Sequence, residues 1–379
     1  MTVWIVNPFD NLPPEGYRPQ RYWLMARAFA QAGHQVTYWT SDFSHAHKAP
    51  RQFKETIAPD GFRLTLVPTA PYPANICLRR VRSHRALART WRQMAAASPE
   101  RPDVVIASLP PLSLASGALA FCRTVGARFV VDVQDAWPET FYRVAPAWLF
   151  APLRAVARRI YRAADAVTAV AARYLDLARS YGATAPAHLC HLGIDLPPRP
   201  ALRSPSRHLN LLYLGAMGKS YDLETVIDAI KETDDAELDL AGTGPKEKAL
   251  RARAADCPRI RFHGYLDAAA LQTLFAQADA GVIPMFPDSC VGVPNKLADY
   301  VAAGLRIVNS LPGETADLIA RFAAGAFYAA GDVQSFKDAV SALRRPAPDF
   351  ASDAFRDFFD ARRLYAGYVD FIQNLTRQP

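Results

Sequence analysis

The sequence has few cysteines, and their spacing excludes several classes of protein. Its 379 residues include five cysteines, at positions 77, 122, 190, 257 and 290, and no C-x-x-C pair occurs. Scattered cysteines in odd number argue against a disulfide-stabilised scaffold and against a zinc site, and they suit a reducing compartment. We therefore expect a cytoplasmic protein that is not cross-linked by disulfides.

Long apolar runs are also missing. No stretch reaches the roughly 18 apolar residues that a membrane-spanning helix needs. The chain begins Met-Thr-Val-Trp, without the basic region of a secretory signal peptide. We expect a globular protein of the cytoplasm, with any membrane contact being peripheral and at the inner face of the cell membrane.

Acidic residues are scarce in the first half of the chain. The net charge is +8, but residues 1–195 hold 23 Lys and Arg against 13 Asp and Glu, whereas the remainder holds 21 against 23. The basic excess thus belongs to the first half alone. Such a half attracts acidic partners: membranes, nucleic acids or phosphorylated substrates.

Two common nucleotide-binding fingerprints are absent. No G-x-x-x-x-G-K-[ST] segment occurs, so the chain has no P-loop. The pair Gly242-x-Gly244 stops short of G-x-G-x-x-G because position 247 is glutamate, which does not favour hydride transfer with a dinucleotide. Glu237 and Asp239 fall inside a predicted strand, so we expect no D-x-D metal site.

The chain alternates short β-branched runs with helical patterns. Continuous apolar strands separated by helices predict parallel sheets covered on both faces, hence an α/β fold with two doubly wound, Rossmann-like domains facing a cleft. The strands expected in the first half are 3–6, 35–40, 63–67, 103–107, 128–133, 166–170 and 188–192. Those expected in the second half are 209–214, 236–241, 260–263, 280–284 and 305–310. Ligands of such sheets bind beyond the carboxyl ends of the strands.

The boundary between the domains is predicted from composition. Residues 196–208 hold four prolines and two serines without periodicity, which indicates a linker. We therefore expect an N-terminal domain over 1–195 and a C-terminal domain over 209–354. A helical, amphipathic tail over about 355–379 is expected to pack back on the N-terminal domain.

The loop after the first strand is long and rich in proline and glycine. Gly16, Tyr17 and Arg18 would bring backbone N–H groups and a guanidinium towards an anion at a helix start. Arg21 lies at the start of that helix and is a candidate for contact with the second substrate, as is Arg18. The alternative is a plain surface loop, although long loops in compact domains are usually functional.

The loop after strand 128–133 carries polar groups where the cleft is expected. Asp132 is predicted to end the strand, and Gln134, Asp135 and Trp137 follow at its carboxyl edge. Asp135 either caps the following turn or exchanges a hydrogen bond or proton with a substrate hydroxyl. Gln134 would face the same substrate.

The second half contains two candidate phosphate loops. Gly215 and Gly218 form a strand-to-helix turn that is followed by Lys219. The segment 291–304, VGVPNKLADYVAAG, places backbone N–H groups and an ammonium at a helix start, which suits a phosphate.

Two residues of the 291–304 segment carry the more specific expectation. Lys296 would hold the phosphate, and Asp299, one turn later, would accept hydrogen bonds from the two vicinal hydroxyls of an attached ribose. The alternative is a local ion pair between Lys296 and Asp299 on a solvated helix.

These segments, in their order and spacing, resemble the family 4 retaining glycosyltransferases of the GT-B fold. The similar pieces include LYLGAMGK, AGTGP, RIRFHGYL, LFAQADAGVIP, VPNKLADYVAAGLRIVNS and PGETADLI, together with FAQAGHQVTYWTS and DVQDAWPE in the first half. The DxWP and VPxK pieces resemble the subgroup that acts in bacterial surface-polysaccharide assembly. The resemblance implies a sugar nucleotide of UDP or GDP type in the second domain and an acceptor in the first.

The resemblance also implies roles for individual residues. The donor diphosphate would meet Lys219, Gly292, Asn295 and Lys296 of the second domain, and Gly16 and Tyr17 of the first. The ribose would meet Asp299, and the base would meet Gly264 and Tyr265. The usual mechanism of the family needs no metal and no resident cofactor, because cationic loops neutralise the leaving diphosphate.

The sequence departs from the family pattern at two places. The first glutamate of E-x7-E falls on Val291, so the donor sugar must be held by other groups, for which Asp288 and Ser289 are candidates. The histidine that many relatives carry after the fifth strand is replaced by Gln134 followed by Asp135. In the mechanism usually proposed for the family, the leaving phosphate itself takes the acceptor proton, so loss of the histidine need not abolish activity. Without that histidine, Asp135 becomes the candidate catalytic side chain.

Residues 76–96 are predicted to form a basic amphipathic helix. Its apolar residues fill an arc of roughly 140°, beside a stripe formed by Arg82, Arg85, Arg89 and Arg92. This pattern fits a core-packed helix with a solvated arginine face, or a surface that docks onto anionic lipid. No nucleic-acid reader motif is present, so no nucleic-acid partner is expected.

The sequence thus predicts a retaining glycosyltransferase that moves a sugar from a nucleoside-diphosphate sugar to a glycan or lipid-linked acceptor in cell-surface polysaccharide or glycoconjugate synthesis. Two alternatives remain open. One is a sugar-nucleotide epimerase or hydrolase of the same fold. The other is a catalytically weak binding subunit, motivated by Val291 and Gln134.

Overall fold

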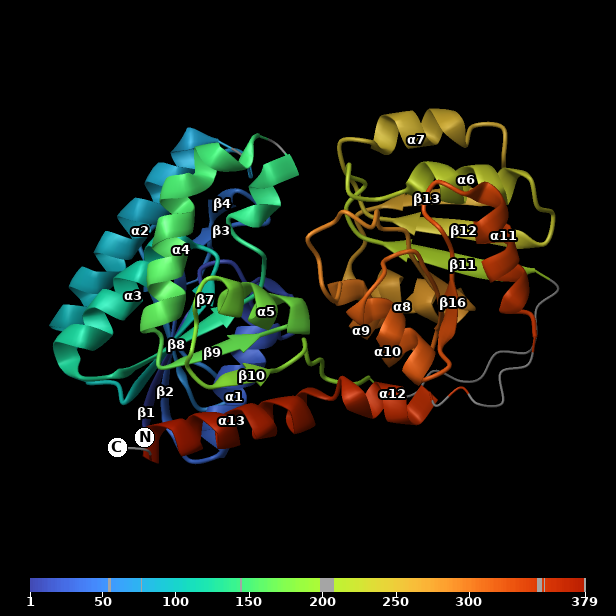
Figure 1. Cartoon of the computed structure of the whole chain (residues 1–379). Helices are drawn as coiled ribbons and strands as arrows, with labels where there is room; N and C mark the ends of the chain where they lie inside the picture. The colour runs from blue at the N-terminus through green and yellow to red at the C-terminus, as the bar shows by residue number, and fades with distance from the viewer. Residues whose placement is uncertain are drawn as a thin grey trace. The chain divides into compact units, whose positions relative to one another are not determined.

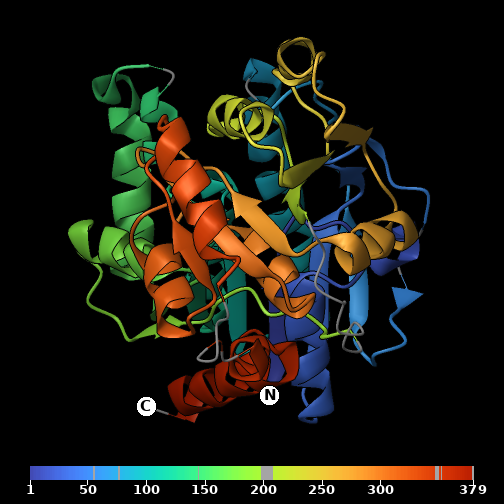
Figure 2. The same ribbon diagram turned by 90° about the vertical axis from the view of Figure 1, so that its right-hand side faces the viewer.

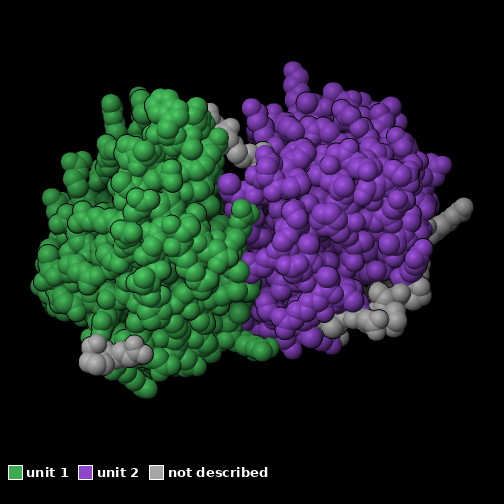
Figure 3. All heavy atoms as spheres, viewed as in Figure 1, with its two compact units in different colours: residues 1–195, 361–379 green, residues 196–360 purple. Residues whose placement is uncertain are grey.

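A computed structural model describes residues 1–53, 56–75, 77–143, 145–197, 208–345, 350 and 352–377. The chain divides into two compact units, coloured separately in Figure 3. Unit 1 comprises Met1–Asp195 and Ala361–Pro379, and unit 2 comprises Leu196–Asp360. Each unit is built around its own predominantly parallel sheet, so the predicted α/β class with two doubly wound domains is confirmed.

Unit 1 contains an eight-stranded sheet in the order β10-β9-β8-β7-β1-β2-β6-β5, in which only β5 runs antiparallel to its neighbour. Its strands are β1 (Thr2–Val6), β2 (Gln35–Ser41), β5 (Thr56–Ile57), β6 (Arg63–Val67), β7 (Val104–Leu109), β8 (Arg128–Val133), β9 (Ala166–Ala169) and β10 (Ala187–Leu189). A small hairpin joins β3 (Phe43–Ser44) to β4 (Ala49–Pro50). Every strand predicted in the first half is present.

Helices cover both faces of this sheet (Figure 1). They are α1 (Arg21–Gln31), α2 (Leu78–Ala97), α3 (Leu112–Val125), α4 (Ala151–Ala163), α5 (Ala172–Ser180) and α13 (Ala361–Arg377), with short 3-10 helices η1 (Pro13–Glu15), η2 (Glu139–Arg143) and η3 (Ala147–Phe150). Successive residues of β1 show why two layers form. Val3 and Ile5 pack in the core with α1 and α13, whereas Trp4 stacks on Phe121 of α3, with ring centroids 5.5 Å apart.

Unit 2 contains six parallel strands in the order β13-β12-β11-β14-β15-β16. They are β11 (Leu209–Leu214), β12 (Ala236–Ala241), β13 (Ile260–Gly264), β14 (Ala280–Ile283), β15 (Arg306–Asn309) and β16 (Gly325–Phe327). Its helices are α6 (Leu223–Lys231), α7 (Glu247–Arg253), α8 (Ala268–Gln277), α9 (Asn295–Ala302), α10 (Glu314–Arg321), α11 (Val333–Ala342) and α12 (Ser352–Phe358). The order reverses between β11 and β14, the switch point at which sheets of this type bind ligands.

The C-terminal tail differs from the single helix expected over about 355–379. It is broken into α12, which belongs to unit 2 and packs on α9, and α13, which belongs to unit 1 and packs on α1 (Figures 1 and 2). The Ala361 N–H bonds the carbonyl oxygen of Ile194 at 3.0 Å, and a Cβ on Gly193 would lie only 2.9 Å from the Cα of Ala361. A glycine thus allows the returning chain to approach this closely. Most of the expected linker, 198–207, lies outside the described residues.

Candidate functional site

The most unusual group of unit 2 is the buried ammonium of Lys296, in the first turn of α9. Lys296 is 7% exposed, and its Nζ has no hydrogen-bond partner among the described residues. The ammonium instead lies 4.0 Å from the ring centroid of Tyr213 and 4.2 Å from that of Tyr221. Burial lowers the pKa of Lys296 well below its usual value, and the charge of Asp299 opposes this shift only in part.

This arrangement argues against one of the two expectations for Lys296, the ion pair with Asp299 on a solvated helix. No hydrogen bond joins its Nζ to Asp299 among the described residues, so the solvated ion pair is not what the structure contains. A buried cation without a hydrogen-bond acceptor is costly, and an anion with several oxygens would relieve that cost. The role of Lys296 in holding a phosphate remains a prediction, with which this burial is compatible.

Tyr300 fixes α9 against the sheet. Its hydroxyl accepts a hydrogen bond from the Leu214 N–H at 2.9 Å and lies 3.2 Å from the carbonyl oxygen of Val282, so it bridges β11 and β14. The ring lies against Gly281, where an added Cβ would be only 2.2 Å from the Cδ2 of Tyr300. A tyrosine on the helix and a glycine on the strand therefore place the start of α9, and with it Lys296, at the switch point.

The loop after β11 lies over the Lys296 ammonium. Gly215 has a φ of 126°, and a Cβ there would lie 3.4 Å from Lys296 Nζ. Gly242, with a φ of 136°, allows the loop after β12 to pack against this one, because its Cβ would fall 2.0 Å from the oxygen of Gly215. The Met217 N–H donates to the Thr243 carbonyl at 2.9 Å. The pair Gly242-x-Gly244 thus serves loop packing.

The other unit 2 residues expected to meet the diphosphate also follow the carboxyl ends of the unit 2 strands. Gly292 is buried, and its carbonyl accepts a hydrogen bond from Thr315 Oγ1 at 2.8 Å. Asn295 is exposed at the first position of α9, and Lys219 is exposed in the turn after β11. Asn295 and Lys219 are accessible to a ligand, whereas Gly292 serves as backbone support.

The remaining donor-side candidates follow neighbouring strands. Gly264 ends β13 and its carbonyl accepts the Gly242 N–H at 2.7 Å, while the next residue, Tyr265, is 70% exposed. Asp288 is exposed and Ser289 is buried in the turn after β14, where the Ser289 N–H bonds the Phe286 carbonyl at 3.0 Å. Asp299 is half-buried on α9. Because β13, β12, β11 and β14 are consecutive in the sheet, these loops share one edge.

In unit 1, the structure gives Arg21 a role different from the expected contact with an acceptor. Its guanidinium makes two hydrogen bonds to Asp132, at 2.9 and 2.8 Å, and a third to the Cys190 carbonyl at 2.9 Å. The arginine side chain is 2% exposed and the aspartate side chain is fully buried. Arg21 is therefore a core group, and the prediction that it contacts an acceptor is corrected.

Asp132 accepts hydrogen bonds from several elements of unit 1. Besides Arg21, its carboxylate accepts from Tyr22 of α1 at 2.7 Å, from Thr168 of β9 at 2.6 Å and from the Gln134 amide at 2.6 Å. Burial disfavours the carboxylate, but Arg21 and these bonds hold the pKa of Asp132 below its usual value. One N–H of the Gln134 amide is thus directed to Asp132, which leaves its second N–H and its amide oxygen as groups for an acceptor.

Asp135 lies in the loop after β8 and remains accessible to solvent. The surrounding protein partly desolvates the carboxylate and raises its pKa to about 6, against the lesser effect of the Arg80 charge. A carboxylate with a pKa near neutrality at the carboxyl end of a parallel sheet can exchange protons with a hydroxyl.

A cluster of rings surrounds Arg80, a residue that the sequence did not single out. The guanidinium carbon lies 5.4 Å from the ring centroid of Trp137, 5.6 Å from Phe9 and 5.9 Å from Tyr72. Arg80 Nε also donates to His84 Nε2 at 3.4 Å. Cation–π contacts of this kind orient a guanidinium without neutralising it.

The histidines near Arg80 are held neutral. Desolvation, reinforced by neighbouring cations, lowers the pKa of His84 to about 3 and that of His45 to about 4. His45 Nδ1 lies 2.5 Å from the Tyr72 hydroxyl. Burial also raises the pKa of Asp10, in the loop after β1, to about 7. These side chains come from four separate segments, and no spacing in the sequence could have joined them.

Comparison with known proteins agrees with this architecture. Residues 19–193 match the family described as Glycosyl transferase 4-like domain, and residues 208–345 match the family described as Glycosyl transferases group 1. The chain belongs to the family 4 glycosyltransferases of the GT-B fold. The glycosyltransferase is 25% identical over 260 residues to sulfoquinovosyl transferase SQD2 of Arabidopsis thaliana, covering 64% of this chain and 49% of that protein.

Solved structures share the fold of this glycosyltransferase. Sucrose-phosphate synthase from Thermosynechococcus elongatus matches with a TM-score of 0.79 at 12% identity, covering 99% of this chain and 98% of that one. HepE of Anabaena, in complex with UDP and glucose, matches with a TM-score of 0.68 at 12% identity, covering 99% and 100%. These likenesses concern the fold.

The loop after β1 of the glycosyltransferase is firmly held. Gly16, with a φ of 82°, ends η1, and the Tyr17 hydroxyl hydrogen-bonds His47 of the β3–β4 hairpin. Glu15 forms an ion pair with Arg51, which is buried. Arg18 is exposed beside them. The loop is thus an ordered platform at the carboxyl edge of the sheet.

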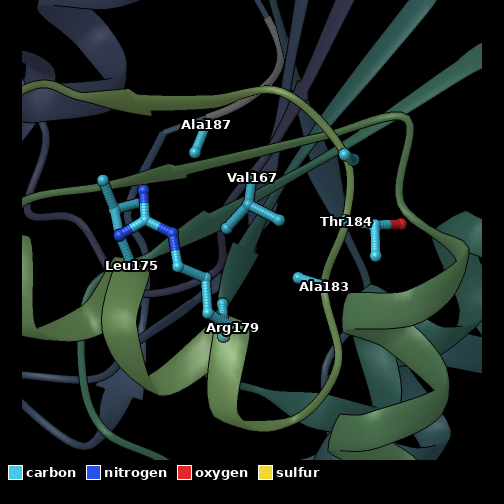
Figure 4. Close-up of a pocket in the computed structure, with 8 residues that line it drawn as sticks. Val167, Leu175, Arg179, Ala183, Thr184 and Ala187 are labelled. Carbon is cyan, nitrogen blue, oxygen red and sulfur yellow. The ribbon is translucent and has the colours of Figure 1, made fainter.

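A hollow of about 330 Å³ lies elsewhere in unit 1 of the glycosyltransferase, between α5, β9 and β10 (Figure 4). Small apolar side chains line most of it. Its one ionisable lining residue, Arg179, pairs with Asp176 at 2.8 Å. This hollow lacks groups for catalysis, and it contains none of the residues predicted for the site. Within the described residues, no helix combines the length and apolar character needed to cross a membrane.

Proposed function

We propose that the protein is a retaining glycosyltransferase that moves a sugar from a UDP- or GDP-linked donor to a glycan or lipid-linked acceptor in cell-surface polysaccharide or glycoconjugate synthesis. The carrying observation is the buried Lys296 ammonium, which has no hydrogen-bond partner among the described residues. The curated relative named a sulfoquinovosyl transferase, of which the chain spans about half, and the UDP complex of HepE support this proposal.

In this proposal, unit 2 binds the donor. Lys296, Lys219 and the exposed start of α9 at Asn295 meet the diphosphate, with Gly292 supporting their loop. Asp299 accepts hydrogen bonds from the ribose hydroxyls, and Gly264 and Tyr265 contact the base. An anion beside Lys296 favours its charged form, so the ammonium is available when negative charge develops on the leaving diphosphate. Asp288 and Ser289 serve the donor sugar in place of the glutamate missing at Val291.

Unit 1 binds the acceptor in this proposal. In the transfer, the bond between the anomeric carbon and the diphosphate oxygen breaks, and a bond to the acceptor oxygen forms on the same face. The acceptor hydroxyl gives its proton to the released phosphate oxygen. Asp135 accepts a hydrogen bond from that hydroxyl, while Arg18 and the Gln134 amide oxygen help to hold the acceptor. No metal or resident cofactor is required in this scheme.

The test is incubation with a panel of UDP and GDP sugars, with and without candidate acceptors, while nucleoside diphosphate release is followed. Release that depends on acceptor, with a product of unchanged anomeric configuration, is the expected result. Release without acceptor would favour a hydrolase or epimerase. Tight donor binding with no turnover on any acceptor would favour a binding subunit.

A further inference from the structure

A groove in unit 1 is lined by arginines from two helices. The groove has a volume of about 770 Å³. Arg82, Arg85, Arg89 and Arg92 line it from α2, and Arg159 lines it from α4. Residues of α3, which contacts both helices, complete the lining. The four α2 arginines recur at helical spacing, so one face of the helix supplies all of them.

The charge of this surface is not balanced by local acids. The helices α2, α3 and α4 carry six, one and four arginines, and no aspartate or glutamate. None of the five groove arginines makes a hydrogen bond or ion pair with a described residue. Other arginines of unit 1 are paired, such as Arg27 with Asp195 and Arg128 with Asp165. The groove therefore concentrates cations that have no partner in the described chain.

The α3 residues that form the floor of the groove are small, except for Leu119. Ser113, Ser116, Gly117 and Ala120 of α3 lie along it. A Cβ on Gly117 would lie 3.5 Å from Cδ of Arg92 and from the Ala88 carbonyl oxygen, so α2 and α3 pack closely at this point. Small floor residues between arginine walls leave a space that a phosphate group can enter. One guanidinium group can donate two parallel hydrogen bonds to two oxygens of a phosphate, so arginine side chains suit this ligand.

Large apolar side chains are exposed at the beginning of two of the helices that line the groove. Leu78 and Val81, in the first turn of α2, are 77% and 47% exposed. Trp148 and Leu149, in η3 directly before α4, are 73% and 49% exposed. Both α2 and α4 begin at the upper end of unit 1 in Figures 1 and 2. One end of the unit thus presents apolar side chains next to unpaired arginines, the combination that binds a membrane interface.

We propose that this groove binds the phosphate groups of an anionic lipid, while Leu78, Val81, Trp148 and Leu149 enter the lipid surface. A nucleic acid would use the arginines but not the exposed apolar groups, so the lipid accounts for both observations. The inference does not depend on glycosyl transfer, because vesicle binding is measured without donor or acceptor. Failure of one proposal therefore leaves the other intact.

The test compares variants of the full chain that lose equal charge. Arg85→Gln with Arg89→Gln removes two groove cations. Arg363→Gln with Arg377→Gln removes two exposed cations from α13 of the same unit. Binding to phosphatidylcholine vesicles with and without phosphatidylglycerol is measured by sedimentation. With each cation near the surface contributing about 1 kcal/mol, the groove variant should bind anionic vesicles about thirty-fold more weakly.

A second variant keeps every arginine. Ser116→Glu places a carboxylate on the groove floor and should also weaken binding, more strongly than the α13 double variant does. The α13 double variant should change binding less than about threefold, because its cations lie outside the groove. Trp148→Ala should weaken binding at both low and high salt, since its contribution is apolar.

Three results would overturn the proposal. Equal losses in the groove and α13 variants would show general charge attraction without a site. Displacement from vesicles by soluble glycerol phosphate at concentrations comparable to lipid phosphate would show that a free phosphate, not a lipid, is the ligand. Binding of an RNA oligonucleotide through these arginines, without binding of anionic vesicles, would assign the groove to nucleic acid.

Discussion

The Lys296 ammonium lies 4.0 Å from the ring centroid of Tyr213 and has no hydrogen-bond partner among the described residues. Aromatic faces stabilise a buried cation less well than an oxygen acceptor does, since they leave its N–H donors unsatisfied. The ligand-free protein therefore contains an energetic cost that an anion would remove. The account of donor binding depends on this relationship.

Replacement of Lys296 should raise the stability of the ligand-free protein. Lys296→Met keeps the length of the side chain and removes the unpaired cation, so unfolding in urea should require about 1 to 3 kcal/mol more free energy. Folding lowers the pKa of Lys296, so the unfolded wild type binds a proton more readily than the folded one and the wild type loses stability as pH falls. The stability advantage of Lys296→Met should therefore grow at lower pH. Lys219→Met, at an exposed position, should change stability by less than about 0.5 kcal/mol. A strongly destabilised Lys296→Met would contradict this reasoning.

Gly281 should tolerate no side chain. In Gly281→Ala, the Cβ would lie 2.2 Å from the Tyr300 ring, and displacing that ring would disturb its contacts with β11 and β14. We expect a loss of about 1 to 3 kcal/mol in the free energy of unfolding. Gly218→Ala is the matched control, because no heavy atom beyond its two chain neighbours lies within 4 Å of its added Cβ. Equal stability of the two variants would show that Tyr300 does not fix α9.

The bond between Arg21 and Asp132 should be essential for stability. Arg21→Met would leave a buried carboxylate without its cation, and we expect unit 1 to lose about 3 to 5 kcal/mol of unfolding free energy. Arg18→Met, at an exposed position, should change the free energy of unfolding by less than about 0.5 kcal/mol. Normal stability of Arg21→Met together with weakened acceptor binding would restore the acceptor role for this residue.

Asp135 should control the acidic side of the pH profile. The pKa of Asp135 is about 6 in the folded protein, above the ordinary 3.8. The protonated carboxyl group therefore stabilises the folded protein fully below pH 3.8, and this stabilisation is lost as pH rises through 6. Asp135→Asn should therefore be more stable than the wild type above pH 6 and similar to it below 3.8. If the carboxylate accepts a hydrogen bond from the acceptor, kcat/KM should fall below pH 6 in the wild type only. An unchanged acidic limb in the variant would remove Asp135 from the reaction.

Much of the fold could be predicted because its signals are local. Continuous runs such as 128–133 and 209–214 are buried on both faces, and each is a strand in the structure. Strand β16 was not predicted, since Gly325–Phe327 has only three residues and no distinctive pattern. The break between α12 and α13 was missed because the amphipathic pattern continues across it. Only the contacts of Ala361 with the chain near Gly193 reveal the return to unit 1.

The candidate site was predictable only where a single loop carries its chemistry. The segment containing Lys296 combines a helix start with an ammonium, and both features are visible in the sequence. The surroundings of that ammonium were not, because Tyr213 of β11 and Tyr221 of the segment after β11 reach it from another part of the sequence. The same holds for Arg80, whose ring partners come from three separate segments. The structure also places Arg21 in the core of unit 1, where it binds Asp132, and not at an accessible position for an acceptor.

The most direct test is calorimetric titration of the wild type and Lys296→Met with UDP and GDP, in buffers of different ionisation enthalpy. The account predicts that one of these ligands binds the wild type with proton uptake at mildly alkaline pH, because the anion raises the pKa of Lys296. The variant should bind it about ten- to a hundred-fold more weakly, as expected for loss of a charged hydrogen bond, and without that uptake. Equal affinity and equal proton uptake in the two proteins would contradict the assignment of Lys296 as the donor diphosphate site.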